Sequence, residues 1–380
     1  MDEYTKTTKQ GLGQRFVESI WKVIIGVILF ISSFGLLYWN EGKIDQSKIA
    51  KAAIEISSET LNTDPTLNEK LVFSTGTLNS PETIGDNQFL KPGKYLAFTR
   101  KVEMFSWQEN QKEEKQKHVG GSQTTKTTYS YIKKWTHNPT NSSMFKKPAE
   151  HQNPSKTIND QSNKVNVATI GVYNIDMANV TLPKPSPLQL TPQNTTLNNK
   201  ATLNNDYIYI PTSPGSSMQN PQIGDMRISY FVIPSETDAT ILGKLKSDKI
   251  STYIDKNNNK IYRLFYGTSE SAIAQLRSEF LFEIWIFRLL GFLFMWLGLF
   301  LLFGPIITLL DIIPIFGSLG SAITLLITFI TSFILSFITI IVSMIFHSLI
   351  ALLIAIGITI FLMIIVLLRI KRKRKISTSI

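Results

Sequence analysis

The stretch from Leu289 to Leu368 decides the fold, and it reads LLGFLFMWLGLFLLFGPIITLLDIIPIFGSLGSAITLLITFITSFILSFITIIVSMIFHSLIALLIAIGITIFLMIIVLL. It contains no Lys or Arg, and Asp311 and His347 are its only acidic and imidazole side chains. A helix needs about 20 apolar residues to cross a hydrocarbon core of about 30 Å. The stretch can hold three such helices, with breaks at 304–320 and near 343–348. We predict transmembrane helices at 288–304, 320–343 and 347–368, with a connecting loop at 305–319. One long kinked helix, or a hairpin that does not fully cross, stays open for the last part.

A further apolar segment lies near the N-terminus, from Val23 to Trp39, and it carries no charged residue. Basic residues precede it, as in a signal peptide, but no cleavage site of small residues directly follows it. Tyr38 and Trp39 end the segment, and such side chains are typical of the membrane interface. We therefore predict an uncleaved transmembrane helix at 23–39, after a cytoplasmic segment at 1–22.

The last apolar run is directly followed by a basic tail, residues 369–380. Basic residues beside a membrane helix favour the cytoplasmic side and attract anionic lipids. Because the basic residues lie directly beside the membrane, we interpret them as setting the membrane topology and binding anionic lipids rather than as binding nucleic acid. The residues are Arg369, Lys371, Arg372, Lys373, Arg374 and Lys375. Four helices then place both chain ends in the cytoplasm and residues 40–287 on the periplasmic or lumenal side.

Residues 40–287 are predicted to form one α+β domain that is mainly antiparallel. Seven segments alternate with period two and are rich in β-branched and aromatic residues, as strands are. They are Leu71–Leu78, Lys94–Trp107, Lys126–Trp135, Val167–Ile175, Asp206–Ile210, Asp225–Ile233 and Ile261–Tyr266. Polar loops are expected at 108–125, 139–163 and 182–205. Helices are expected at Glu236–Lys246 and Ser269–Phe287, the second continuing into the membrane.

The composition excludes several classes of chemistry. The chain has 380 residues, no Cys, four His and a formal net charge of +11. Without Cys it has no disulfide, no catalytic thiolate and no Cys-ligated metal. It has no G-x-S-x-G, phosphate-binding loop or dinucleotide motif, and His137 and His151 have no convincing third metal ligand. We expect no catalytic residue, no cofactor and no metal site.

Asp311 is the most unusual residue of the apolar stretch, because a carboxylate inside a bilayer is costly and often functional. Our preferred interpretation is that it caps a short helix at the interface, since Pro305 and Pro314 each suit a helix start. His347 is expected in a solvated turn. A Ser/Thr face of the third predicted helix is expected to pack against other helices rather than line a pore. It comprises Thr324, Thr328, Thr331, Ser332, Ser336, Thr339 and Ser343.

The order of motifs resembles that of the LUMA (transmembrane protein 43) family. The matches begin with the N-E-G motif at Asn40–Gly42 and continue through V-E-M-F-S-W-Q-E at 102–109 and Y-S-Y-I-K-K-W at 129–135. S-S-M-F at 142–145, H-Q-N-P at 151–154 and G-D-M-R-I-S at 224–229 follow. Last comes W-I-F-R-L-L-G at 285–291, with Met295, Gly298, Pro305, Asp311, Ile313, Pro314 and Gly317 after it. Glu150 stands where the family more often has Gly, so the turn before His151 can differ.

The resemblance implies one N-terminal and three C-terminal membrane helices around a lumenal or periplasmic domain. It also implies a role in organising membrane protein complexes, at the nuclear envelope and endoplasmic reticulum in animals, and it supplies no catalytic residues. Trp285 and Arg288 are predicted to anchor the second helix, and Gly291 and Gly298 to allow close helix contact. The family-motif residues that we single out are Asn40, Glu41, Gly42, Trp107, Trp135, His151, Asn153, Pro154, Asp225, Arg227, Trp285, Arg288, Gly291, Pro305, Asp311 and Pro314.

These observations favour a non-enzymatic membrane scaffold. The expected partners are the lipid bilayer, other membrane proteins and further copies of the chain, with no nucleic acid. A transporter or channel that uses Asp311 and the Ser/Thr face is one alternative, and an enzyme acting on lipid or envelope precursors is another. The abundance of Lys, Asn, Ile and Thr indicates an AT-rich genome. We expect a bacterial member of the family, in an inner membrane, because no family feature demands a nucleus. In a eukaryotic cell, the sequons at Asn141, Asn179 and Asn194 would be glycosylated in the endoplasmic reticulum.

Overall fold

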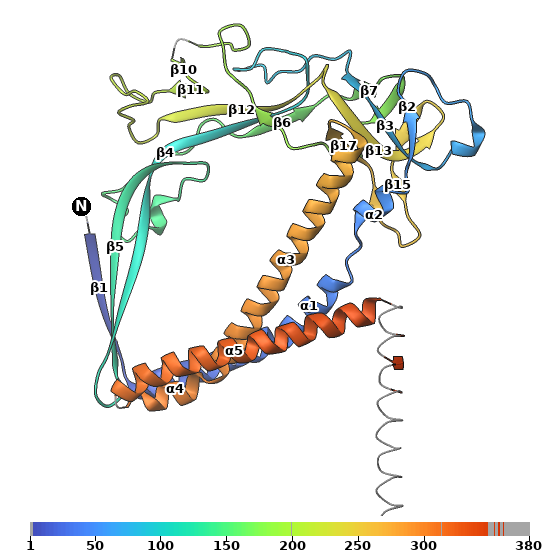
Figure 1. Ribbon diagram of the computed structural model, residues 1–380. Helices are drawn as coiled ribbons and strands as arrows, with labels where there is room; N and C mark the ends of the chain where they lie inside the picture. The colour runs from blue at the N-terminus through green and yellow to red at the C-terminus, as the bar shows by residue number, and fades with distance from the viewer. Residues whose placement is uncertain are drawn as a thin grey trace, which may run out of the picture. The chain divides into compact units, whose positions relative to one another are not determined.

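The computed structural model describes residues 3–198, 200–312 and 314–348, together with positions 353, 356, 357 and 360 (Figure 1). It divides into two compact units. The β unit comprises residues 1–6, 45–113 and 126–278. The helical unit comprises residues 7–44, 114–125 and 279–380. The chain therefore leaves the β unit and returns to it twice before it ends in the helical unit.

The first sheet contains the longest strands. Its order is β1-β5-β4-β12-β11-β10, and β6 and β9 pair at its side with β4 and β12. The strands are β1 Glu3–Gln10, β4 Tyr95–Lys117, β5 Gln123–Thr136, β6 Gln161–Lys164, β9 Ser186–Pro187, β10 Thr202–Asn204, β11 Tyr207–Ile210 and β12 Met226–Pro234. β4 and β12 pair antiparallel, with Ile228 opposite Val102. Alternate residues of both strands are buried, which forms one apolar core on one face of the sheet.

The second sheet has the order β17-β13-β14-β8-β7-β3-β2, and β13 also pairs with β3. Its strands are β2 Ile54–Ser57, β3 Leu71–Asn79, β7 Val167–Ile170, β8 Tyr173–Asp176, β13 Asp238–Lys246, β14 Lys249–Ser251 and β17 Arg263–Tyr266. Only the β2–β3 and β14–β8 pairs are parallel. β15 (Tyr253–Ile254) and β16 (Lys260–Ile261) form a small separate pair. The predicted large, mainly antiparallel β domain is confirmed, and each of the seven predicted segments contains a strand.

The helix predicted at Glu236–Lys246 is wrong, because this segment is the strand β13. β13 pairs with β3 on one side and with β17 on the other, so its backbone groups are satisfied by strands. Thr240 and Ile241 are β-branched, and Gly243 disfavours a helix interior. Pairing with a segment far away in the sequence therefore outweighs the local pattern.

The polar loop predicted at 108–125 is largely strand. β4 continues to Lys117 and β5 begins at Gln123, so only a short turn lies between them. Gly120 and Gly121 supply the turn with φ values of 85° and 77°, which are readily accessible only to glycine. Near this turn the end of β4 is exposed and the start of β5 is half-buried on both faces, and for that reason their sequence lacks the alternation of a strand with one buried face.

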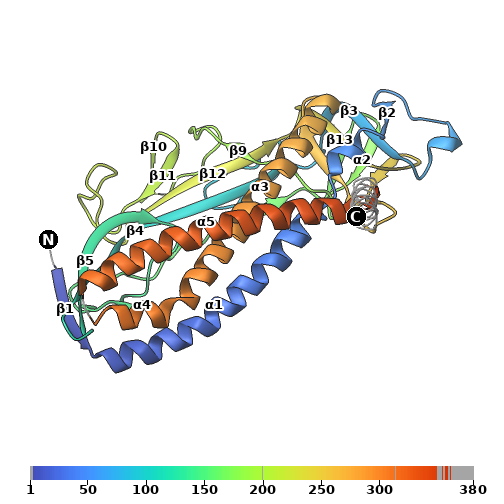
Figure 2. The ribbon, with the colours of Figure 1, turned by 60° about the horizontal axis from the view of Figure 1, so that its bottom comes forward.

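The helical unit contains most of three long apolar helices (Figure 2). α1 is Leu12–Glu41, α3 is Ser269–Leu302, α4 is Gly304–Leu310 and α5 is Pro314–His347. α1 lies against both α4 and α5. In the part of the chain that the structure describes, three helices are long and apolar enough to cross a membrane. Most of the fourth helix predicted at 347–368, and the whole basic tail, lie outside the described residues.

The remaining helices are short and belong to the β unit. They are α2 Gln46–Ala50 and the 3-10 turns η1 Pro65–Leu67 and η2 Ser142–Met144. The first turns of α3 also belong here, because Ala272 and Leu276 are buried against Leu242 and Phe265. The predicted amphipathic helix that continues into an apolar helix is therefore present as one element, α3.

Candidate functional site

The first polar cluster of the helical unit surrounds Glu41, at the C-terminal end of α1. The carboxylate accepts two hydrogen bonds from Arg288, from Nε to Oε1 and from Nη2 to Oε2, each 2.8 Å long. Only 4 % of the Glu41 side chain is exposed, against 18 % for Arg288. The Trp285 ring centroid lies 4.9 Å from the Arg288 guanidinium carbon. A bidentate pair of this kind fixes the orientation of α1 against α3.

The neighbours of Glu41 extend this Glu41 cluster. Asn40 donates from Nδ2 to the Ile284 carbonyl at 3.1 Å. Gly42 faces His347, and a Cβ at position 42 would lie 2.5 Å from the imidazole Nε2. The His347 ring lies 4.5 Å from the ring of Tyr38. The N-E-G motif thus joins the C-terminal end of α1 to the middle of α3, and His347, at the C-terminal end of α5, contacts the same place.

The second polar cluster, the Asp311 cluster, lies near the N-terminal end of α1. Asp311 follows α4 and is fully buried. Its carboxylate forms ion pairs with Arg15 and, at 2.7 Å, with Lys117 from the β4–β5 turn region. Arg15 also donates to the carbonyl of Gly121 at 2.6 Å, and Gly120 N donates to the carbonyl of Ile312 at 3.0 Å. Asp311 thus occupies the C-terminal cap position of α4, and its carboxylate forms ion pairs with two basic side chains.

Close packing of α1 on α3 depends on glycine. A Cβ at Gly298 would lie 2.7 Å from Phe30 N and 2.9 Å from the carbonyl of Gly26. A Cβ at Gly291 would lie 2.5 Å from the Leu37 side chain. Small residues of this kind let helix backbones approach in membranes. Pro305 lies in the first turn of α4, and Pro314 begins α5.

The Ser/Thr face of α5 is directed at its neighbours. Thr328, Ser332, Ser336 and Ser343 are buried. The Thr328 and Ser343 hydroxyls donate to carbonyls one turn earlier in α5, each within 2.7 Å, and Ser336 contacts Met295 Sδ at 3.4 Å. Two of these hydroxyls thus bond to the backbone of α5 itself, and the Ser336 contact joins α5 to α3.

In the β unit, Asp225 accepts hydrogen bonds from five donors. Its carboxylate is fully buried and is bonded by Tyr209 Oη, the backbone N and Oγ1 of Thr212, Ser216 Oγ and Gln222 N. Burial alone would raise the pKa of Asp225, but these bonds together hold that pKa below its usual range. Burial, followed by the bond to Asp225, raises the pKa of Tyr209 to about 12. The motif carboxylate is thus an ionised anchor for the β11–β12 connection.

Arg227 lies two residues further on and connects three strands. Its guanidinium pairs with Glu103 of β4. The same group stacks on Trp135 of β5 at 4.8 Å and on Tyr207 of β11 at 4.6 Å. The motif residues Trp135 and Arg227 are therefore held together, although 92 positions separate them in the numbering.

His151, Asn153 and Pro154 hold the loop after β5. Asn153 accepts from Trp107 N at 2.7 Å and donates to the Trp107 carbonyl at 3.0 Å. The buried His151 ring stacks on Tyr131 at 3.6 Å and meets the Trp107 ring edge-on at 4.7 Å. Burial, followed by a bond to Glu109, raises the pKa of Tyr131 to about 12. A Cβ at Gly224 would lie 2.9 Å from Pro154 Cγ.

Sequence reasoning missed a buried ionic network around Asp86. Asp86 pairs with Arg100 at 2.6 Å, accepts from Tyr230 Oη and is bonded by the backbone N of Phe89 and Leu90. Burial would raise the pKa of Asp86, but Tyr230 and the backbone donors hold that pKa below its usual range. The sequence did contain a signal for this network, because Arg100 occupies an inward-facing position in the alternating pattern of β4. Such an Arg needs a buried acid.

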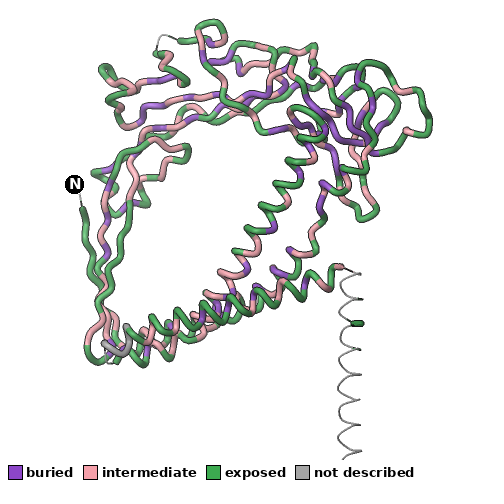
Figure 3. Tube along the Cα trace, in the orientation of Figure 1, coloured by how far each residue is buried: buried purple, intermediate pink, exposed green. Residues whose placement is uncertain are grey.

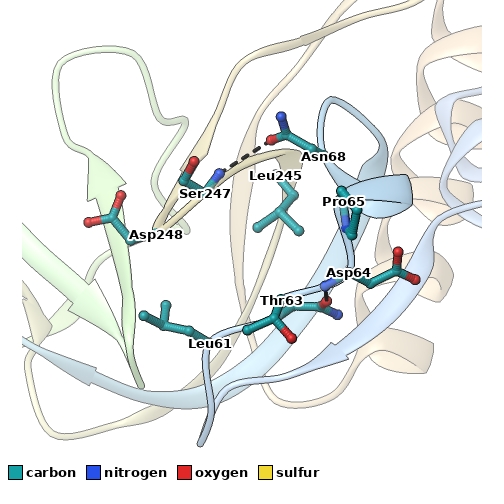
Figure 4. Close-up of a pocket in the computed structure, with 9 residues that line it drawn as sticks. Leu61, Thr63, Asp64, Pro65, Asn68, Leu245, Ser247 and Asp248 are labelled. Carbon is teal, nitrogen blue, oxygen red and sulfur yellow. Dashed lines mark hydrogen bonds between the residues drawn. The ribbon is translucent and has the colours of Figure 1, made fainter.

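Two cavities of the β unit, as lined by the residues that the structure describes, lack a convergent set of reactive groups. The larger of these two, of about 420 Å³, lies between the 61–68 segment and the turn after β13 (Figure 4). Its two acids, Asp64 and Asp248, come from different segments, and Ser247 N donates to Asn68 at 3.3 Å. A second cavity, of about 320 Å³, is lined by Lys164, Asp176 and Lys249. Among the residues described, no group of three or more His, Asp or Glu is placed to hold a metal ion.

These features define an integral membrane protein with apolar helices and a large, mainly antiparallel β domain. A family profile described as Transmembrane protein 43 matches residues 104–349, and the chain belongs to this family. The chain is 23 % identical to Transmembrane protein 43 of Mus musculus over 341 residues, which cover 83 % of each chain. It is 23 % identical to the Homo sapiens protein over 334 residues, 83 % of this chain and 82 % of that one.

The chain is also 25 % identical to the Transmembrane protein 43 homolog of Drosophila melanogaster over 294 residues, 74 % of this chain and 77 % of that one. These relatives are animal proteins, so they give the predicted bacterial origin no support. Their names describe transmembrane proteins and mention no enzymatic activity. No solved structure matches the chain.

Proposed function

We propose that the protein is a non-enzymatic membrane scaffold that holds other membrane proteins, lipids and further copies of itself. The observation that carries this proposal is the use of the motif residues. Glu41 and Arg288 bind each other, Asp225 accepts five hydrogen bonds, and Asn153 binds both backbone groups of Trp107. Side chains used in this way shape a surface rather than react with a substrate.

Chemical crosslinking in native membranes, followed by affinity purification, tests the scaffold. The wild type is expected to give discrete oligomers and stable partner adducts. The Arg288→Glu variant, which breaks the Glu41 cluster, is expected to lose them, and the charge exchange Glu41→Arg with Arg288→Glu is expected to restore part of them. A purely monomeric wild type without stable partners contradicts the proposal.

A transporter or channel is the second candidate, because Asp311 is a buried carboxylate beside candidate membrane helices. Its two cationic partners, Arg15 and Lys117, weaken this candidate, since they neutralise the group that would attract a cation. Measurement of ion or lipid flux in reconstituted vesicles tests the transporter or channel candidate. Equal flux for the wild type and Asp311→Asn eliminates the transporter.

The side of the membrane on which residues 40–287 lie is also part of our proposal. Residues 40–287 would face the lumen of the endoplasmic reticulum in an animal cell, or the periplasm of a bacterium. Asn141 and Asn179 are exposed sequon residues of the β unit. Expression with endoplasmic-reticulum microsomes should therefore give glycosylated chains, and the triple variant Asn141→Gln, Asn179→Gln and Asn194→Gln should remove that mass shift. Unmodified wild-type chains under conditions that glycosylate a control protein contradict the lumenal placement.

A further inference from the structure

The N-terminal strand belongs to the β unit. β1 lies at the edge of the first sheet beside β5, and the Tyr4 and Tyr129 rings lie 6.0 Å apart. Residues up to Lys6 belong to the β unit, and the chain enters this unit again at Asp45. The Asp45 carboxylate then caps α2 and forms an ion pair with Arg277. The polypeptide therefore leaves the β unit, forms α1 and returns to the β unit.

Contacts within the helical unit also connect both ends of α1 to the region between α1 and α3. The β4–β5 turn, residues 114–125, is part of this unit. Its Lys117 and Gly121 bind the Asp311 cluster near Arg15, at the start of α1. The end of α1 is held by Arg288 in the Glu41 cluster. The region between α1 and the apolar part of α3 thus touches both ends of α1.

A helix that crosses the bilayer has its ends on opposite sides, so part of the β4–β5 hairpin would then have to cross as well. The hairpin sequence QENQKEEKQK at 108–117 is almost wholly charged or amide-bearing, and most of it is exposed. An open strand edge is not tolerated in hydrocarbon, because its backbone groups lack partners. Both ends of α1 are therefore expected on the side of the hairpin.

The exposed faces of α1 and α5 nevertheless require an apolar surrounding. The buried residues of α1 repeat every seven positions at Ser19, Gly26 and Ser33, and much of the rest of the helix is exposed (Figure 3). The face opposite the buried residues is apolar apart from Glu18 and Lys22 near the start of the helix. This face includes Val17, Ile20, Ile24, Ile28 and Ile31. α5 carries no charged side chain from Pro314 to Phe346, and it exposes Ile323, Leu326, Ile330, Phe333 and Phe337. An apolar surface of this extent marks a membrane contact.

We infer that α1 and α5 lie along the bilayer within one leaflet, with their exposed faces in contact with the acyl chains of that leaflet. A 30-residue helix is about 45 Å long at 1.5 Å per residue, whereas one leaflet of the core is about 15 Å deep. α1 can keep both ends at one interface only if it lies along the membrane. Trp21, in the first third of α1, and Trp39, near its C-terminal end, are 66 % and 55 % exposed, as interfacial anchors would be. This inference is independent of the scaffold proposal and replaces the expectation that the N-terminus lies opposite residues 40–287.

Cysteine labelling tests the inference on a chain that has no native cysteine. Single substitutions at exposed positions, Thr7→Cys, Val119→Cys and Lys256→Cys, report the N-terminal strand, the hairpin turn and the β unit. A membrane-impermeant maleimide is added to sealed vesicles of one orientation, and detergent-opened vesicles show that each site can react. All three positions are expected to react from the same face. Reaction of Thr7→Cys from the face opposite Lys256→Cys overturns the inference.

Depth measurements provide a second, independent readout. Spin labels are attached at Ile20→Cys, Ile24→Cys and Ile31→Cys, which share the exposed face of α1. A helix along one leaflet keeps the labels at nearly equal depth. A helix normal to the bilayer separates positions 20 and 31 by about 16 Å along that normal. A steady change in depth along these positions overturns the inference, and neither experiment depends on partner binding.

Discussion

At the scale of single residues, several motif residues contact one another. Glu41 meets Arg288, Arg227 meets Trp135, and Asn153 meets Trp107. Each pair joins segments that are far apart in the sequence. The sequence allowed these residues to be singled out one by one. It could not pair them, because pairing depends on strand order and helix direction, which no local pattern contains.

Reversing the charge of Arg288 should destabilise the helical unit. The Arg288→Glu substitution leaves two carboxylates facing each other in a largely buried place, so a loss of about 3 kcal/mol or more of unfolding free energy is expected. Thermal unfolding of the detergent-solubilised protein measures it. The exchange of both charges should recover part of the loss, whereas no recovery would show that the pair itself is not the cause.

Asp225 should make the β unit sensitive to acid. The pKa of Asp225 is lowered in the folded chain, so its stabilisation is present above the pKa of an unfolded Asp, about 3.9, and is lost as the pH falls through the lower folded value. Asp225→Asn should cost about 2 kcal/mol at neutral pH and flatten the loss of stability below about pH 4. Denaturant unfolding of the two proteins across pH 2.5–7 measures both effects, with the exposed Asp206→Asn as control. Parallel pH curves for wild type and Asp225→Asn contradict this role.

At the scale of elements, the sequence was informative wherever a strand or helix buries one face. The alternation in β12 and the apolar run of α3 both predicted their elements. The pattern was insufficient for β13, which strands on both sides enclose, and for the parts of β4 and β5 next to their turn, where neither face is buried. In these places, hydrogen bonds to distant segments decide the conformation, and side-chain periodicity carries little information.

The α1–α3 contact should depend on Gly298. A Cβ at this position meets backbone atoms of Phe30 and Gly26 that cannot move aside independently, so Gly298→Ala should cost about 1–3 kcal/mol through overpacking. Gly35→Ala in α1 is the matched control, because nothing lies within 4 Å of its Cβ position. Thermal unfolding in detergent compares them. Equal stability of the two variants would argue against the close helix contact.

At the scale of the whole molecule, the Asp311 cluster holds the β4–β5 turn on the helical unit. Asp311→Asn removes the charge that attracts Arg15 and Lys117. Trypsin cleavage between residues 112 and 117 should then become several times faster in the folded protein, since an opened segment is cut in proportion to its open population. Mass spectrometry of early digests measures it, and Asp206→Asn should behave as wild type. An unchanged cleavage rate would mean that backbone contacts alone hold the turn.

Whole-molecule organisation was the level least accessible from the sequence. The apolar segments predicted helices of membrane length, but β1 gave little signal. Its residues EYTKTTKQ are almost all exposed, so no apolar alternation marks them as a strand. Their place in the sheet is set by pairing with β5, more than a hundred positions later. The interpretation of α1 depends on that pairing.

The position of β1 also bears on biosynthesis. The ribosome completes Leu12–Glu41 long before it has made β5, which ends at Thr136. During that interval the N-terminal strand has no sheet to join, and the nascent helix meets the insertion machinery alone. On the placement inferred above, α1 would be fixed late, when the hairpin emerges and β5 pairs with β1. A bulky fusion ahead of Glu3 would be expected to interfere at this step of maturation.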